Sequence, residues 1–471
     1  MKHYKKILTI IPAYFVRYRS EIIVFFLAFL VRIIFFVIFL VTVPEFPFIG
    51  SDSYNYVDGA RSLLATGRFI QLDTGESNSY EMPGYPLFLA GLSQAFTSWL
   101  AVPIAQNIIM GLCAVLIWRI GLLFSRKVAW TAALFFAFEP AGIFYSNAIV
   151  TEPIFIFLTL VFLYVLLMYR NGLLSGALAP GVLLGAATMV RPIGAIFLPA
   201  VLVFYLVGKN LSLKQTGIFF GIFFIGWFAV VGPWMLRNKI LFGRAELSAV
   251  ASFQVYHQHA PHFYAYKNSI SERDAERIFQ ERLERLDPYT EEVRAGKVGS
   301  LRHAPYMWQV GLDYIRQYPF QFGAFHILKT VPFFVSDGLR QIARDTQLHA
   351  IPAVNLGSLA LRGKTKGLFN ALTKDPTTFI LFSVGFLFWL GINIMMVIGS
   401  VALIRSSKGA LRALVLFLLL AITLTSLVAG GAVAHPRFRY SVSPLMFLLA
   451  AVGLSHIHSF WLRRKLTFGS K

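Results

Sequence analysis

The chain has 471 residues, of which 57% are hydrophobic and only 14% are charged, and its mean hydropathy is +0.65. A soluble globular protein carries about 25% charged residues, so lipid is the expected solvent for most of this chain. The net charge is +21, but the basic residues stand in short clusters between apolar runs, which argues against nucleic acid as a partner. A single cysteine, Cys113, excludes an intrachain disulfide.

The basic N-terminus precedes an apolar run at 21–43. This run is too long for the apolar region of a signal peptide and lacks a small-residue cleavage site. It predicts an uncleaved signal anchor whose N-terminus lies in the cytoplasm.

Crossing a bilayer takes about 20 apolar residues. About ten runs meet or approach this length: 21–43, 101–123, 127–145, 149–169, 172–190, 193–208, 215–236, 378–404, 411–430 and 440–461. Basic residues gather in the short loops on one side, which makes that side cytoplasmic. The fold class expected is therefore an all-α polytopic membrane protein with about ten transmembrane helices and both termini inside.

The remaining segments suggest three parts. We expect an N-terminal transmembrane module at 1–236 with a first extracytoplasmic loop at 44–100, an extracytoplasmic domain at 237–377, and a C-terminal transmembrane module at 378–471. Nucleotide-binding Gly-rich loops and zinc-type Cys/His clusters are absent from the sequence.

The extracytoplasmic insertion reads as mainly helical. Ser271 is a plausible N-cap for an amphipathic helix that ends near Leu286, and a second helix is predicted over 303–318. The apolar segment 319–336 is interrupted by polar residues and Pro332, so we expect it on the membrane surface. If it crosses, the number of spans rises to twelve.

The first loop opens with a short amphipathic helix, predicted over 53–66 and lying in the membrane interface. Gly67 suits its C-terminal end, and Ser51 or Asp52 can cap its start. Asp52 therefore has two interpretations, an ordinary N-cap and a functional acid.

Two further carboxylates stand at the extracytoplasmic ends of spans. Glu81 lies in a turn fixed by Pro83, and Glu152 begins the fourth span, directly before Pro153. A carboxylate at the edge of the lipid is costly unless it is paired or functional. The alternative for Glu81 is a solvated loop residue.

Four arginines also occupy this face: Arg191, Arg237, Arg437 and Arg439. The positive-inside rule disfavours them here, and guanidinium binds phosphate in a bidentate manner. The alternative is anchoring to anionic lipid head groups. The segment "YHQHAPH" adds His257 and His259, which on a strand would share a face and a metal ligand.

Acids and phosphate-binding cations at one lipid boundary favour group transfer from a lipid-linked phosphate. The carboxylates would supply a general base and a divalent metal site, and the cations would hold the leaving phosphate. A polysaccharide polymerase or ligase with a lipid-linked donor remains open. So does a non-enzymatic flippase or transporter, which would place its charges near the bilayer midplane.

Six motifs occur in order: an acid after the first span, "SYEMPGYPLFLA", "YSN…TEPIF", "VRPIG", "PWMLRN…FG" and "HPRFRYSVSPL". In these the chain resembles the bacterial polyprenyl-phosphate-sugar-dependent glycosyltransferases of the GT-C superfamily. The nearest groups are the protein O-mannosyltransferase-like family and the lipid A aminoarabinose transferases. The resemblance implies an enzyme of the cytoplasmic (inner) membrane, acting on the periplasmic side and inverting the anomeric centre.

The resemblance also implies roles for individual residues. Asp52 matches the catalytic acid of the first loop, and Glu152 matches the second acidic position. Arg191, Arg437 and Arg439 would hold the donor phosphate.

Glu81 matches an acid near that phosphate and would bind a metal, with His257 or His259 completing the site. Where the aminoarabinose group has a lysine after this acid, the chain has Met82, which weakens assignment to lipid A modification. The donor would be a polyprenyl-phosphate sugar, and the acceptor, whether lipid, glycan or protein, is not specified by the sequence.

Overall fold

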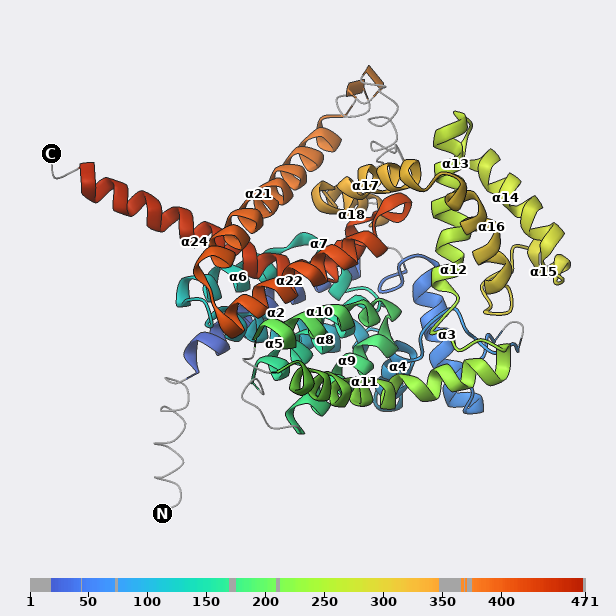
Figure 1. Ribbon diagram of the computed structural model, residues 1–471, viewed down its shortest axis with the longest axis horizontal. Coiled ribbons are helices and arrows are strands. Elements are labelled where there is room, and N and C mark those ends of the chain that lie inside the picture. The colour runs from blue at the N-terminus through green and yellow to red at the C-terminus, as the bar shows by residue number, and fades with distance from the viewer. Residues whose placement is uncertain are drawn as a thin grey trace, which may run out of the picture.

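The computed structural model describes residues 18–43, 45–72, 75–168, 175–208, 212–346, 366–367, 369–370 and 375–468 (Figure 1). Regular structure in these ranges is helical, apart from an isolated bridge between Ile70 and Ser77. The expected all-α membrane fold is confirmed.

The apolar bundle contains most of the chain. Its helices are α2 (Arg19–Thr42), α5 (Ala101–Gly121), α6 (Arg126–Phe138), α7 (Pro140–Ser146), α8 (Glu152–Met168), α9 (Ser175–Val190), η1 (Pro192–Phe197), α10 (Leu198–Gly208), α11 (Leu213–Phe242), α21 (Pro376–Ser406), α22 (Gly409–Val428), η3 (Gly431–Val433), α23 (Pro436–Tyr440) and α24 (Ser443–Phe468). The first loop contributes α3 (Gly50–Thr66) and α4 (Gly84–Ala95).

Each of the ten predicted runs coincides with one of these helices or with a pair of them. In the described residues, five helices are long and apolar enough to cross a membrane: α2, α5, α11, α21 and α22. The pair α6 and α7, bent by 57°, is a sixth candidate. In the other four runs, the described residues form apolar stretches of 10–17 residues in α8, α9, η1 with α10, and the first part of α24.

The bend between α6 and α7 explains the buried charge of α2. Pro140 has no N–H to donate to the Phe136 carbonyl four residues earlier. Arg32 of α2 fills that place: its guanidinium donates to the carbonyls of Phe136 and Ala137 at 3.1 and 3.2 Å. This mid-span arginine therefore closes a broken helix end.

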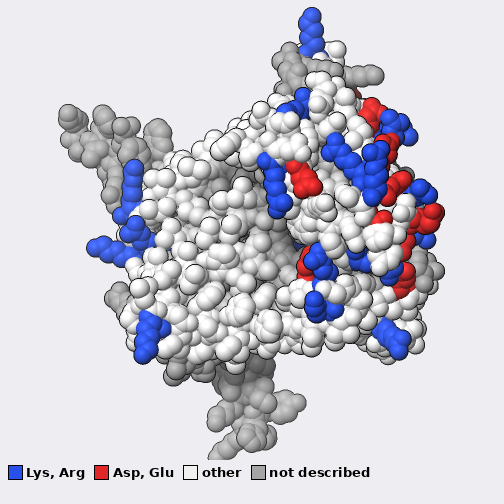
Figure 2. All heavy atoms as spheres, turned by 45° about the vertical axis from the view of Figure 1, so that its right-hand side comes forward, with Lys and Arg blue, Asp and Glu red and all other residues white. Residues whose placement is uncertain are grey.

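The insertion after α11 is helical, as expected. It contains α12 (Val250–Gln254), η2 (Val255–His259), α13 (Ala260–Asn268), α14 (Glu272–Leu286), α15 (Thr290–Arg294), α16 (Ala304–Gln317), α17 (Pro319–Val335) and α18 (Leu339–Asp345). Ser271 caps α14 as predicted, by accepting the Asp274 N–H at 3.0 Å. Buried residues of α14 and α16 share a separate apolar core. Figure 2 shows the charged residues gathered over this part of the molecule, beside a broad face nearly free of charge.

Two expectations for this region have different outcomes. The helix predicted over 303–318 is confirmed as α16. Segment 319–336 forms α17, a helix that continues through Pro332, and its place on the membrane surface stays a prediction. Much of 347–374 lies outside the described residues.

Helices α21 and α24 approach each other through glycines. A Cβ added at Gly399 would collide with the Leu449 carbonyl oxygen, whereas at Gly391 on the same helix it would meet nothing within 4 Å. The close approach of α21 and α24 therefore requires glycine at Gly399, whereas Gly391 has room for a larger side chain.

Gly399→Ala should lower the free energy of unfolding by about 1–3 kcal/mol, because the added methyl forces the two backbones apart. Gly391→Ala is the matched control and should change it by less than about 1 kcal/mol. Thermal unfolding of both variants in detergent measures the difference. Equal melting temperatures would show that the helices do not pack in this way.

Candidate functional site

Two segments far apart in sequence are tied together where α3 and α8 begin. The Ile149 N–H donates to the Pro47 carbonyl at 3.1 Å. The Ser53 hydroxyl donates to the Ile149 carbonyl at 2.9 Å and accepts the Ile49 N–H at 3.0 Å. These bonds place the first turn of α3, which carries Asp52, beside the start of α8.

Glu152 is fully buried at the first position of α8. Arg191 Nη1 lies 2.5 Å from its carboxylate and Arg437 Nε lies 2.6 Å from it. Arg191 also donates to the Thr151 hydroxyl at 2.7 Å. A buried charge is tolerated only when it is paired and hydrogen-bonded, and here two guanidinium groups meet that need.

Arg437 extends the pairing to a second acid. Its Nη1 donates to Asp52 at 2.7 Å. The Asp52 side chain is 47% exposed, against 19% for Arg437 and 15% for Arg191. We call Asp52, Glu152, Arg191 and Arg437 the four-residue network. Asp52 is the member most open to a molecule arriving from solvent.

Arg191 and Arg437 both lie at or near helix ends. Pro192 stops α9 at Val190 and leaves Arg191 extended, at φ −142°, before η1. His435 caps α23, and its Nδ1 accepts the Arg437 N–H at 3.2 Å. Burial, helped by Arg437, lowers the pKa of His435 to about 4, so the ring is neutral and can accept this bond.

The cap predicted for Asp52 is wrong. Helix α3 begins at Gly50, earlier than expected, with Ile49 at the N-cap and no side-chain cap bond. Asp52 therefore lies inside the first turn, where its side chain is free to pair with Arg437. The predicted end at Gly67, in the left-handed conformation, is confirmed.

Tyr56 lies one turn after Asp52 on α3. Burial raises the pKa of its phenol to about 12, although Arg437 opposes the rise. The phenol therefore stays protonated beside the network and keeps its donor.

Glu81 is held by an Asn78 side chain that sequence reasoning missed. The Asn78 amide donates to Glu81 at 2.5 Å, and its oxygen accepts the N–H groups of Tyr80 and Glu81. Burial raises the pKa of Glu81 above its ordinary value, and the Asp52 charge adds to the rise. The signal for Asn78 is its place at the start of this turn, which asparagine favours.

Two predicted phosphate-binding arginines lie apart from the network. Arg237 donates to the carbonyls of Asn78 and Phe69 at 2.7 and 3.2 Å and stacks on Trp234. Arg439 is fully buried and donates to main-chain carbonyls at the end of α17, at 2.9 to 3.2 Å. Arg237 thus holds the first loop, and Arg439 docks α23 on α17.

The two histidines lie on the π-helical turn η2, so the strand considered for them is wrong. Burial, with His326 adding to it, lowers the pKa of His259 to about 4. In the described part of the chain, no group of three or more His, Cys, Asp or Glu residues is placed to hold a metal. Glu81, His257 and His259 therefore do not form the expected ligand set.

Residues 83–236 match the family model of dolichyl-phosphate-mannose-protein mannosyltransferases. This segment contains Glu152 and Arg191 of the network. No curated protein sequence matches the chain significantly.

The fold is also found in a crystal structure of the Archaeoglobus fulgidus oligosaccharyltransferase, tethered by a disulfide bond to an acceptor peptide containing the NVT sequon. The TM-score is 0.53 and the identity 14%, over 96% of this chain and 51% of that one. At this identity the likeness shows the fold alone, and the chain spans about half the length of the archaeal protein.

Glu152→Gln should lower the free energy of unfolding by about 3–5 kcal/mol, because it leaves the half-buried Arg191 guanidinium without its anion and Arg437 with Asp52 alone. The matched control is Asp58→Asn, which breaks an exposed pair with Arg61 and should cost less than about 1 kcal/mol. Thermal unfolding in detergent compares the two. Similar losses would mean that Glu152 does not carry the network.

Proposed function

We propose that the chain is a membrane glycosyltransferase of the GT-C type that moves a sugar from a polyprenyl-phosphate donor to an acceptor. The reaction takes place on the extracytoplasmic face of a bacterial cytoplasmic membrane and inverts the anomeric centre. The observation that carries the proposal is the four-residue network: an accessible carboxylate beside two arginines that a buried carboxylate holds in place.

The chemistry is an in-line displacement. Asp52 takes the proton of the acceptor hydroxyl or amine as the acceptor atom bonds to the anomeric carbon. The bond from that carbon to the phosphate oxygen breaks, and its electron pair leaves with the polyprenyl phosphate. Attack from the side opposite the leaving group inverts the centre, and Asp52 ends the step protonated.

Arg437 and Arg191 balance the charge of the leaving phosphate. Each keeps N–H groups beyond those bonded to Glu152, and guanidinium matches phosphate in a bidentate manner. Glu152 is buried, so its role in this proposal is to orient the arginines rather than to touch the sugar. Positioned cations stabilise a developing charge without reorganisation during the reaction.

We assign the acceptor to a cavity of about 650 Å³ that begins one turn of α3 away from Asp52. It lies between the first loop and the insertion and is lined by Asn55, one turn from Asp52, and by Glu81. Its charged lining residues are Asp58, Glu76, Glu81, Glu292 and Lys297. The excess of acid favours a neutral, hydroxyl-rich or cationic acceptor over a phosphorylated one.

The position of Met82 also disfavours a phosphorylated acceptor. It is buried and packs with Phe69 and Trp234, so it presents nothing to a phosphate where the aminoarabinose group would place a lysine. Lipid A phosphate is therefore not the favoured acceptor.

The contacts of the charged residues support neither a metal ion in the reaction nor the alternative that the chain is a transporter. Asp52 and Glu152 are each bonded to arginine, so no step here is assigned to a metal. A transporter needs accessible charge near the midplane. The mid-span Arg32 is instead fully buried, with its guanidinium on main-chain carbonyls.

Asp52→Asn should lower the transfer rate about 10²–10⁴-fold, because the amide cannot accept the acceptor proton. Consumption of polyprenyl-phosphate sugars by the purified protein, followed by mass spectrometry, measures the rate. Asp313→Asn replaces another exposed aspartate and should leave it unchanged. Full activity of a folded Asp52→Asn variant would overturn the assignment of Asp52 as base.

A further inference from the structure

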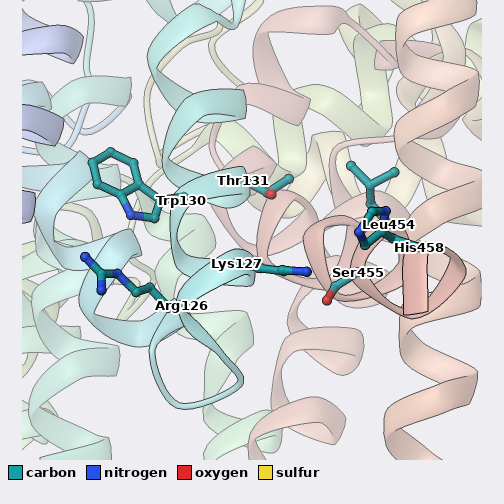
Figure 3. A pocket seen from close by; sticks show the side chains of 7 residues that line it. All are labelled: Arg126, Lys127, Trp130, Thr131, Leu454, Ser455 and His458. Atoms are coloured by element: carbon teal, nitrogen blue, oxygen red, sulfur yellow. The ribbon is translucent and has the colours of Figure 1, made fainter. Parts of the chain in front are cut away.

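A second hollow lies at the other end of α6. The polypeptide runs from Arg126 along α6 and α7 before it reaches Glu152, so the start of α6 and the network lie at opposite ends of the bundle. Here α6 and α24 enclose an open groove of about 760 Å³. Figure 3 shows Lys127 reaching from α6 toward Ser455 and His458 on α24.

The groove is rich in cationic and hydroxyl groups and lacks acid. Arg126 and Lys127 are exposed in the first turn of α6, and His458 is exposed on α24. Residues 126–138 and 443–468 contain no Asp or Glu. Within the described ranges, no carboxylate lies within 4.0 Å of these three side chains. Among the described residues, the positive charge of Arg126 and Lys127 therefore has no carboxylate partner.

An apolar track leads away from this charge into the membrane. Arg126, Trp130, Leu134 and Phe138 follow one another at four-residue intervals, which places them on one ridge of α6. Leu134 is 38% exposed and Phe138 is 52% exposed. Along this ridge a cationic side chain is therefore followed by an indole, which favours the membrane interface. Exposed apolar side chains follow the indole.

We propose that this groove binds an anionic glycerophospholipid in the leaflet opposite the network. Arg126 and Lys127 donate to the headgroup phosphate, and Thr131 and Ser455 lie within the same groove for the glycerol oxygens. An acyl chain lies along Leu134 and Phe138. The site fixes α6 and α24 in the bilayer and does not depend on the proposed transfer reaction.

The chemistry selects anionic over zwitterionic lipid. The choline cation of phosphatidylcholine would find no carboxylate in the groove, whereas phosphatidylglycerol brings a net negative charge to it. Inorganic phosphate matches the headgroup but cannot use the apolar ridge.

The test is native mass spectrometry of delipidated, full-length protein with phosphatidylglycerol or phosphatidylcholine. Wild-type protein should retain phosphatidylglycerol about tenfold more tightly than phosphatidylcholine. The double variant Arg126→Gln/Lys127→Gln should lose this preference. Its matched control is Arg405→Gln/Lys408→Gln, which removes two exposed cations elsewhere and should keep it.

Four results would overturn the proposal. Equal binding of both lipids by the wild-type protein is the first, and it needs no variant to detect. The second is a double variant that retains the preference, and the third is a control that loses it to the same extent. A melting temperature raised as much by inorganic phosphate as by phosphatidylglycerol would identify a free-phosphate site instead.

Discussion

The burial of Glu152 is the constraint around which the candidate site is organised. Removing a carboxylate from water costs several kcal/mol, and only close partners offset that cost. Arg191 and Arg437 provide them, at 2.5 and 2.6 Å, and Arg437 carries the pairing on to Asp52. One buried charge thus ties together the starts of α3 and α8, the end of α9, and α23.

Every member of the four-residue network lies at or near the end of a helix. Asp52 lies in the first turn of α3, Glu152 opens α8, Arg191 follows α9, and Arg437 lies on the short helix α23. A transmembrane helix must stay apolar along its length, so polar chemistry gathers where helices start and stop. Prolines make those ends sharp, as Pro192 does after Arg191. The bundle remains an apolar scaffold while its end becomes a charged site.

Much of this architecture could be predicted, because apolar runs and cap residues are local properties of a sequence. The ten runs and the start of α14 at Ser271 are examples. Partner choice could not be predicted. Arg437 and Arg439 stand two residues apart in one motif, yet one reaches Glu152 and the other reaches the end of α17. The partner of each arginine depends on where its side chain is buried. That position is set by helices that are distant in the sequence. Whether His257 and His259 come near Glu81 likewise depends on packing between distant segments, and the described residues contain no group of three or more such side chains placed to hold a metal.

The central claim is that the four-residue network receives the phosphate of a lipid-linked sugar donor. An electron cryomicroscopy structure of the protein with bound polyprenyl phosphate tests it most directly. The account predicts phosphate density within hydrogen-bonding distance of the Arg191 and Arg437 guanidinium groups, with the Asp52 carboxylate facing the same space. Phosphate density away from these arginines, with the network unchanged, would contradict the account.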